Sequence, residues 1–219
     1  MRILLLTLTD DPFDPAGVGR FGGSQAFFFD LSRQLVRMGH CVTVVTRLND
    51  PGKPRFQSLG PLCSIHRVAV GPPLEVDHHS LGHLREDLIA NVLALPLDGR
   101  FHILQTSNWL SGSVGLGLTP GIADKHVHHL LSLGRVRLTL GEERSAHDKA
   151  RDEWECRIFA SADALVCVTE DERAALERLY PDVEKHKVTI IPYGIDPDIF
   201  SPRPGDAYDY IRRTSNRFT

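Results

Sequence analysis

The chain has 219 residues, of which 42% are hydrophobic and 24% charged, and its formal net charge at pH 7 is -3. This composition is that of a soluble globular protein and excludes a disordered or fibrous chain. Because a basic excess is lacking, we expect no nucleic acid partner. The length suits one well-buried α/β domain.

Apolar residues predict two strands and a helix in the first third of the chain. Residues 2–8 form a continuous apolar run that ends at Thr9-Asp10-Asp11-Pro12, as in a central parallel strand. After a long Gly/Pro/Asp loop, helical spacing predicts a helix from about Ser24 to a stop at Gly39. The β-branched residues 41–46 predict the second strand.

Strands and helices are predicted to alternate over the rest of the chain. We expect strands at 64–70, 101–105, 125–130, 164–168 and 187–191, and helices at 79–97, 109–118, 141–161 and 170–179. This order predicts an α/β fold, a doubly wound and mostly parallel Rossmann-like sheet. We place one domain at residues 1–200 and a linker or C-terminal tail at 201–219, where Pro, Gly and polar residues replace the apolar pattern.

The cysteines and the N-terminus indicate a cytoplasmic protein. The apolar run at the N-terminus is too short for a signal peptide or a membrane span. The four cysteines contain no Cys-x-x-Cys pair and lie in or beside apolar runs, so we predict buried free thiols in a reducing compartment. They are Cys41, Cys63, Cys156 and Cys167.

The first loop contains Gly17-x-Gly19-x-x-Gly22, the spacing of the dinucleotide-binding fingerprint. In that fingerprint the first glycine follows the strand almost directly, whereas residues 9–16 intervene here. The acid expected near the end of the second strand is replaced by Arg47, which would suit the 2′-phosphate of NADP. An NADP-dependent Rossmann oxidoreductase therefore stays open.

A second interpretation of this loop uses only Gly22-Gly23, whose bare backbone N–H groups at a helix start would bind a diphosphate. A third is that the glycines only allow the loop to turn. The acids Asp10, Asp11 and Asp14 in the same loop are interpreted as solvated loop residues.

Six segments resemble, in order, the N-terminal domain of the family 4 retaining glycosyltransferases, the group that includes sucrose-phosphate synthase and the mycothiol-pathway glycosyltransferase. They cover residues 1–202. They are the first strand with Gly22-Gly23-Ser24, residues 35–40 before 42–47, Gln105-Thr-Ser-Asn-Trp-Leu-Ser-Gly112, Leu131-Ser-Leu-Gly-Arg-Val136, Arg151-x-x-x-Glu155 before Ala162-Asp163, and residues 191–202.

The resemblance implies one half of a GT-B architecture, the acceptor-binding half of a hexosyltransferase-type enzyme. Its co-substrate would be a nucleotide-diphosphate sugar, its second substrate a hydroxyl acceptor, and it would need no cofactor and no metal. A C-terminal donor-binding domain or a partner subunit would complete it. The alternative is a non-catalytic acceptor-binding or regulatory module, or a subunit of a split transferase. The tail arginines Arg212, Arg213 and Arg217 indicate a solvated face or a peripheral membrane contact.

The resemblance also assigns candidate binding residues. Gly22, Gly23 and Ser24 would bind the donor diphosphate. Asn108, Ser132, Arg135 and Arg151 would bind the acceptor, although Asn108 also fits a helix N-cap, Ser132 and Arg135 plain loop residues, and Arg151 a surface ion pair with Glu155.

One position departs from the family. Leu131 stands where the family usually has a histidine that contacts the transferred sugar. Either His128 or His129 acts as the catalytic histidine after a small register change, or the chain has weak or no transferase activity, or its acceptor site has been rebuilt. His126 and His128 share one strand face, which also raises a metal site, with ordinary histidines as the preferred interpretation.

Overall fold

The structure, a computed structural model, describes residues 1–14, 22–74, 78–139 and 145–195. Gly17 and Gly19 of the fingerprint, and the tail predicted at 201–219, lie outside these ranges.

Strands and helices alternate along the described chain. The strands are β1 (Arg2–Leu6), β2 (Cys41–Arg47), β3 (Phe56–Gly60), β4 (Cys63–Val68), β5 (Phe101–Ser107), β6 (Ala123–His129), β7 (Ala164–Cys167) and β8 (Val188–Ile190). The α-helices are α1 (Gly23–Arg37), α2 (Arg85–Leu93), α3 (Trp109–Ile122), α4 (Gly134–Thr139), α5 (Ala146–Ser161) and α6 (Glu170–Leu179), and the short 3₁₀ helices are η1 (His78–Leu84) and η2 (Lys185–Lys187).

The strands form one sheet in the order β3-β4-β2-β1-β5-β6-β7-β8. β1 pairs in parallel with β2, where Leu4 faces Thr43, and with β5, where Leu4 faces Leu104. Every other pairing is parallel except that of β3 with β4. The chain leaves β1 toward β2 and later returns to its other side with β5, so the strand order reverses between β1 and β5. The prediction of a doubly wound, mostly parallel sheet is confirmed.

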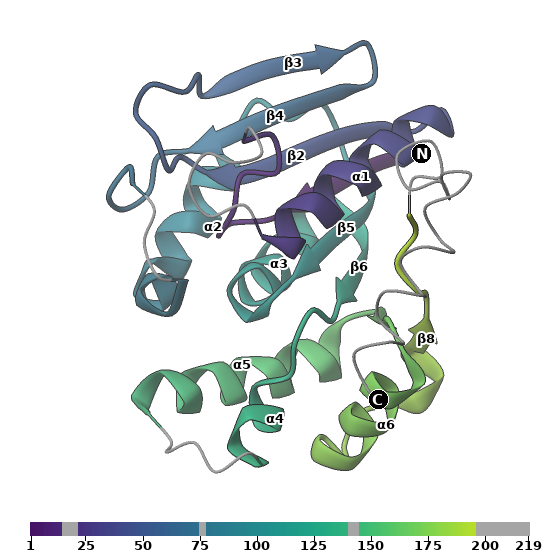
Figure 1. Cartoon of the computed structure of the whole chain (residues 1–219). Coiled ribbons are helices and arrows are strands. Elements are labelled where there is room, and N and C mark those ends of the chain that lie inside the picture. Colours follow the sequence, from purple (N-terminus) through teal and green to yellow (C-terminus); the bar gives the residue numbers. More distant parts are fainter. Residues whose placement is uncertain (15–21, 75–77, 140–144, 196–219) are drawn as a thin grey trace, which may run out of the picture.

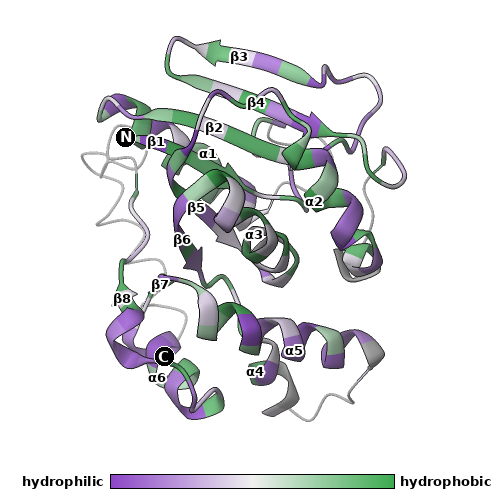
Figure 2. Cartoon of the chain, turned by 180° about the vertical axis from the view of Figure 1, so that it is seen from behind, coloured by the Kyte–Doolittle hydropathy of each residue, from purple (hydrophilic) through white to green (hydrophobic). Residues whose placement is uncertain are grey.

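Helices cover both faces of this sheet (Figure 1). Phe28 of α1 packs on one face against Ile3 and Leu5. Because strand residues alternate, the side chains of Leu4 and Leu6 point to the other face of the sheet. There they pack in a cluster with residues of α2 and α3, the helices on the side of the sheet that Figure 2 shows. A third cluster joins β7 to α5 and α6. Figure 2 shows β2 as mostly hydrophobic and α6 as mostly hydrophilic, as expected for a buried strand and an outer helix.

The sequence-based elements differ from the structure in four places. The loop expected before residue 64 contains β3, which forms an antiparallel hairpin with β4 at the sheet edge. The helix expected at 79–97 is the 3₁₀ helix η1 followed by the shorter α2. The short helix α4 was not predicted, and α3 continues past Pro120 to Ile122, since a proline in the last turn removes only one backbone donor.

The cysteine prediction is correct for the free thiols and wrong for their burial. All four are free, but Cys41 and Cys156 are exposed, and only Cys167 is buried. Among the described residues, no helix combines the length and apolarity needed to cross a bilayer.

Candidate functional site

Asn108 and Ser132 come after the carboxyl ends of β5 and β6, and the start of α1 comes after β1 along the chain. Ligands of doubly wound folds bind at this edge, next to the point where strand order reverses. Here that point lies between β1 and β5, so it is bordered by the loop after Leu6, by the start of α1 and by Asn108.

At the start of α1, several polar groups have no partner among the residues that the structure describes. Gly22 and Gly23 are exposed, and a Cβ built on either would meet nothing within 4 Å. By helix geometry the N–H groups of Gly23, Ser24 and Gln25 have no intrahelical acceptor, and the first turn contains no acid. The Ser24 Oγ is buried with no hydrogen-bond partner among the described atoms. This end of α1 therefore has the positive partial charge that attracts anions.

The loop after β1 is anchored by a buried ion pair rather than by solvent. The Asp11 side chain is fully buried, and its Oδ2 accepts a hydrogen bond from Arg67 Nε at 2.6 Å. Lys53 pairs with Asp14 and lies 3.6 Å from Asp11 Oδ2. The interpretation of the loop acids as solvated is wrong for Asp11 and Asp14, because β4 and the loop before β3 supply cations that the local sequence does not reveal.

Asn108 joins β5 to α3 in an unusual backbone conformation. Its φ of 53° and ψ of 162° make it the one non-glycine residue with positive φ in the part of the chain that the structure describes. Its Oδ1 accepts from the Ser111 N–H at 3.0 Å, so the predicted N-cap exists, and its Nδ2 donates to Thr9 Oγ1 at 3.2 Å. Such strained residues are found at functional sites. Asn108 thus ties the ends of β1 and β5 together at the switch point.

Arg151 belongs to α5 and forms a buried cluster with Glu155 next to the loop that follows β6. Arg151 is 6% exposed and Glu155 2%, and Arg151 Nε donates to Glu155 Oε1 at 2.6 Å. Arg151 Nη2 also donates to the Ser132 carbonyl at 3.1 Å and to Ser132 Oγ at 2.9 Å. The pair that the sequence suggested as a surface salt bridge is therefore internal, and it orders the loop that contains Ser132.

Glu155 holds two further groups. Its carboxylate accepts from the Gly134 N–H, at 2.9 Å for Oε2, and from the Tyr180 hydroxyl. A Cβ at Gly134 would lie 2.9 Å from Arg151 Nε, so a side chain there would displace the pair. Burial and the Glu155 charge raise the pKa of Tyr180. We call Ser132, Gly134, Arg151, Glu155 and Tyr180 the arginine cluster.

Arg135 binds to protein groups next to this cluster. Its Nε donates to Asp152 Oδ1 at 2.5 Å and its Nη1 to the Leu179 carbonyl at 2.5 Å, and the guanidinium lies 4.4 Å from the centre of the Tyr180 ring. The Asp152 hydrogen bond raises its pKa. Arg135 therefore fastens α4 to α5 and α6.

Two of the β6 histidines point toward the helices behind the sheet. His126 Nε2 and His128 Nδ1 both lie 2.8 Å from Thr106 Oγ1. Since a hydroxyl has one hydrogen, Thr106 donates to one ring and accepts from the other. Burial lowers the pKa of His126 to about 4 and that of His128 well below its usual value. His128 is 3% exposed and packs against Phe159, so it is enclosed by protein.

His129 is on the other side of β6. Its ring lies 4.4 Å from that of Phe27 in α1 and is stacked on Tyr193 at 5.8 Å. Burial lowers its pKa to about 4, so the ring is neutral at pH 7, and its Nε2 has no partner among the described atoms. Leu131 follows two residues later and is partly exposed.

The side chains described here do not support an NADP site at Arg47 or a metal site. Arg47, the proposed 2′-phosphate ligand, is 2% exposed and donates to the carbonyls of Pro72 and Leu74 at 2.6 and 2.7 Å, so it is not available to NADP. Among the residues that the structure describes, no group of three His, Cys, Asp or Glu side chains is arranged to hold a metal ion.

The structure has a groove of about 750 Å³ elsewhere, beside β4 and the C-terminal end of α2. Its lining includes Arg2, Arg55, His66 and Leu97 but none of the candidate site residues. It is therefore separate from the carboxyl edge of the sheet.

The sequence did not predict a role for Gln25, Thr106 or Tyr180. For Gln25 a signal existed, since a glutamine three residues after an N-cap is a capping pattern.

Comparisons with known proteins give one consistent assignment. The profile of the glycosyl transferase 4-like domain matches residues 22–194. A D-inositol 3-phosphate glycosyltransferase of Xylanimonas cellulosilytica is 29% identical over 211 residues, which are 94% of this chain and 50% of that protein. The chain thus spans about half the length of the curated relatives it matches.

Solved structures are similar over the same extent. Sucrose-phosphate synthase from Thermosynechococcus elongatus superposes with a TM-score of 0.84 at 26% identity, over 96% of this chain and 52% of that one. HepE from Anabaena, solved in complex with UDP-glucose, shares the fold with a TM-score of 0.56 at 11% identity, over 98% of this chain and 50% of that one.

Proposed function

The chain belongs to the glycosyl transferase 4-like family, and from this premise we propose that it is the acceptor-side half of a retaining glycosyltransferase. Its fold is one Rossmann-like half of the GT-B architecture. The reaction would move a sugar from a nucleoside diphosphate sugar to a hydroxyl acceptor, with a C-terminal domain or a partner subunit holding the nucleotide. That the solved HepE structure contains UDP-glucose supports this class of donor.

The observation that carries the proposal is the open start of α1. The packing of the described residues does not require glycine at 22 or 23, because neither φ is positive and a Cβ would meet none of these residues within 4 Å. A bare backbone at this point instead serves a group that approaches from outside. An anion there would accept hydrogen bonds from the free N–H groups and interact favourably with the helix dipole.

The chemistry asked of α1 is electrostatic. As the bond between sugar and diphosphate breaks, negative charge grows on the leaving phosphate oxygens. The N–H groups of Gly23 and Ser24 would stabilise that charge without a metal, since the helix already orients them and they have no acceptor among the described residues. In a same-face transfer the leaving diphosphate takes the acceptor proton, so a carboxylate nucleophile is not needed.

We place the acceptor between Asn108 and the loop at Ser132. Asn108 is fixed at the switch point, and the Ser132 side chain is exposed beside Arg151. Arg151 and Arg135 would act mainly by holding this loop, since carboxylates already engage both. Of the two candidate histidines, His129 suits a sugar contact better, because its Nε2 has no partner among the described atoms, while His128 is enclosed by protein.

We place the reaction in the cytoplasm, where nucleotide sugars are available. A peripheral membrane contact remains part of the proposal for the case of a lipid-linked acceptor.

An activity assay tests the proposal. The chain alone and the chain joined to the donor-binding half of a relative are incubated with UDP-, GDP- and ADP-glucose and a panel of hydroxyl acceptors, and nucleotide release is measured. We expect turnover only in the joined protein, and its loss in the Gly23→Val variant.

Two results would overturn the proposal. Turnover by the chain alone, at the rate of the joined protein, would show that no donor half is needed. Micromolar binding of NADP that disappears in Arg47→Met would instead support the oxidoreductase.

A further inference from the structure

We propose that Gln25 is a positioning residue that orients the first N–H groups of α1 toward the donor diphosphate, an inference that rests on the proposed function. Gln25 is 4% exposed. Its Oε1 accepts from the Gly22 N–H at 2.8 Å, and its Nε2 donates to the Asp11 carbonyl at 3.1 Å. Because an amide oxygen only accepts and an amide nitrogen only donates, these two contacts fix one orientation of the side chain.

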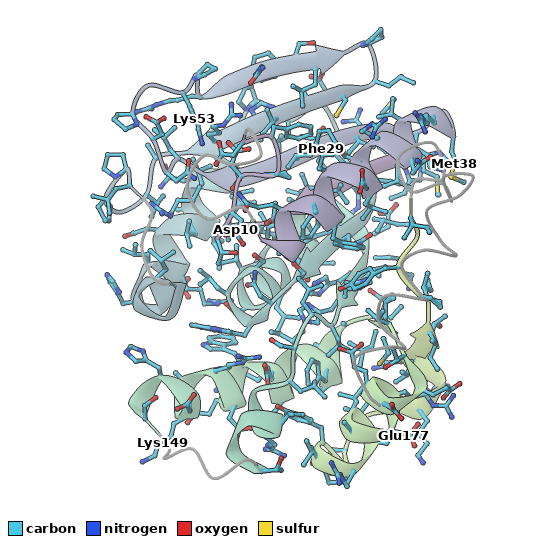
Figure 3. The ribbon with its side chains drawn as sticks, in the orientation of Figure 1. Asp10, Phe29, Met38, Lys53, Lys149 and Glu177 are labelled. Atoms are coloured by element: carbon cyan, nitrogen blue, oxygen red, sulfur yellow. The ribbon has the colours of Figure 1, made fainter. Side chains whose placement is uncertain are left out.

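The Asp11 carbonyl is a firm anchor. Asp11 Oδ2 accepts from Arg67 Nε, and Oδ1 accepts from the Phe13 N–H at 2.9 Å. Arg67 is on β4 and also donates to the Pro54 carbonyl at 3.0 Å. A chain of buried contacts therefore runs from β4 through Asp11 and Gln25 to Gly22. Figure 3 shows the neighbouring Asp10 beside the first turn of α1, with Met38 at the opposite end of that helix.

Gln25 also decides which N–H groups remain for a ligand. It occupies the Gly22 N–H, so those of Gly23 and Ser24 are left to bind the diphosphate. Two consecutive glycines have more backbone freedom than any other residue pair, so without the Gln25 contacts this segment would sample more conformations. The apparent affinity for the diphosphate falls in proportion to the population of the conformation that can bind it.

The experiment is a titration of the 219-residue chain with inorganic pyrophosphate, followed by ¹H–¹⁵N NMR. We expect the Gly23 and Ser24 amides of the unmodified chain to shift most. In Gln25→Leu, which loses both contacts, we expect binding to weaken about five- to tenfold and the Gly22 amide to exchange faster with solvent. Gln34→Leu makes the same change at an exposed position of the same helix and is the matched control.

A second variant separates the two contacts and covers the case in which Gln25→Leu folds poorly. Gln25→Glu still accepts from the Gly22 N–H but cannot donate to the Asp11 carbonyl, and it adds a charge that repels pyrophosphate. We expect slow exchange at Gly22 together with weakened binding. If Gln25 had a purely structural role, the variant would change the melting temperature, but slow amide exchange at Gly22 would not occur together with weakened pyrophosphate binding.

The outcomes distinguish the two proposals. No shift at Gly23 or Ser24 in the unmodified chain would overturn the diphosphate site itself. Shifts there with unchanged affinity in Gln25→Leu would leave that site standing and overturn the role of Gln25.

Discussion

The start of α1 and the arginine cluster lie at the same edge of the sheet, yet they differ in whether their polar groups have hydrogen-bond partners among the described residues. At α1 the glycines are exposed, Ser24 Oγ has no described partner, and the first turn contains no acid. In the arginine cluster Glu155 accepts from Arg151, Gly134 and Tyr180. A polar group that protein partners already satisfy supports the fold, whereas one that is left open is suited to a ligand.

The contrast has a consequence for residues assigned by resemblance. The family resemblance predicts Arg151 and Arg135 as acceptor-binding residues, but their carboxylate partners give them a structural role in this half as well. Mutations there are expected to change stability first, while mutations at the start of α1 are expected to change binding first. The following predictions test this separation, from the largest effect to the smallest.

The largest effect is expected for Glu155→Ala. The variant leaves the Arg151 guanidinium buried without its carboxylate, which we expect to lower the free energy of unfolding by about 3–5 kcal/mol. Urea denaturation measures it. Glu177→Ala, which removes the surface ion pairs with Arg173 and Lys185, is the control and should cost much less. Equal losses in the two variants would contradict a structural arginine cluster.

The next effect is a pH dependence from β6, the strand that leads into the arginine cluster. The pKa of His126 is about 4 in the fold and about 6.5 when unfolded. The unfolded chain therefore binds the proton more readily, so the free energy of unfolding falls as the pH drops from about 6.5 to about 4, by roughly 3 kcal/mol for this group. Denaturation at several pH values should show a smaller fall in His126→Gln than in His186→Gln, the exposed control. Parallel curves would be the contrary result.

A smaller effect is expected at Asn108, which borders the open site but makes protein contacts. Asn108→Ala loses the N-cap bond to Ser111 and keeps the positive φ, so we expect a loss of about 2 kcal/mol in thermal or urea denaturation. Thr169 caps α6 with an ordinary φ of -136°, and Thr169→Ala should cost only about 1 kcal/mol. If the two alanine variants lose the same amount, the backbone at Asn108 is not strained.

The smallest change in stability should accompany Gly23→Ala. Its Cβ meets no protein atom, so we expect unfolding to change by less than about 0.5 kcal/mol. Pyrophosphate binding should nevertheless weaken about tenfold, because the methyl group occupies the space of the ligand. Gly121→Ala, at an exposed glycine of α3, should leave pyrophosphate binding unchanged. If Gly23→Ala bound pyrophosphate as tightly as the unmodified chain, the start of α1 would not differ from the arginine cluster in its role in binding.

The fold was predictable because its signals are local. Apolar runs such as residues 2–8 and the helical spacing after Ser24 depend on neighbours along the chain, and they were enough for the doubly wound sheet. β3 was missed because it is short, lies at the sheet edge and has an exposed face with little apolar pattern.

The sequence by itself determined the family, the alternation of strands and helices, and the glycines at the start of α1. Only the tertiary structure decided that Asp11 meets Arg67, that Arg151 and Glu155 are buried, and that Gln25 joins two segments. These pairings link residues far apart along the chain or depend on burial. A side chain's partners and its solvation are properties of the packed domain, and no local pattern of residue types records them.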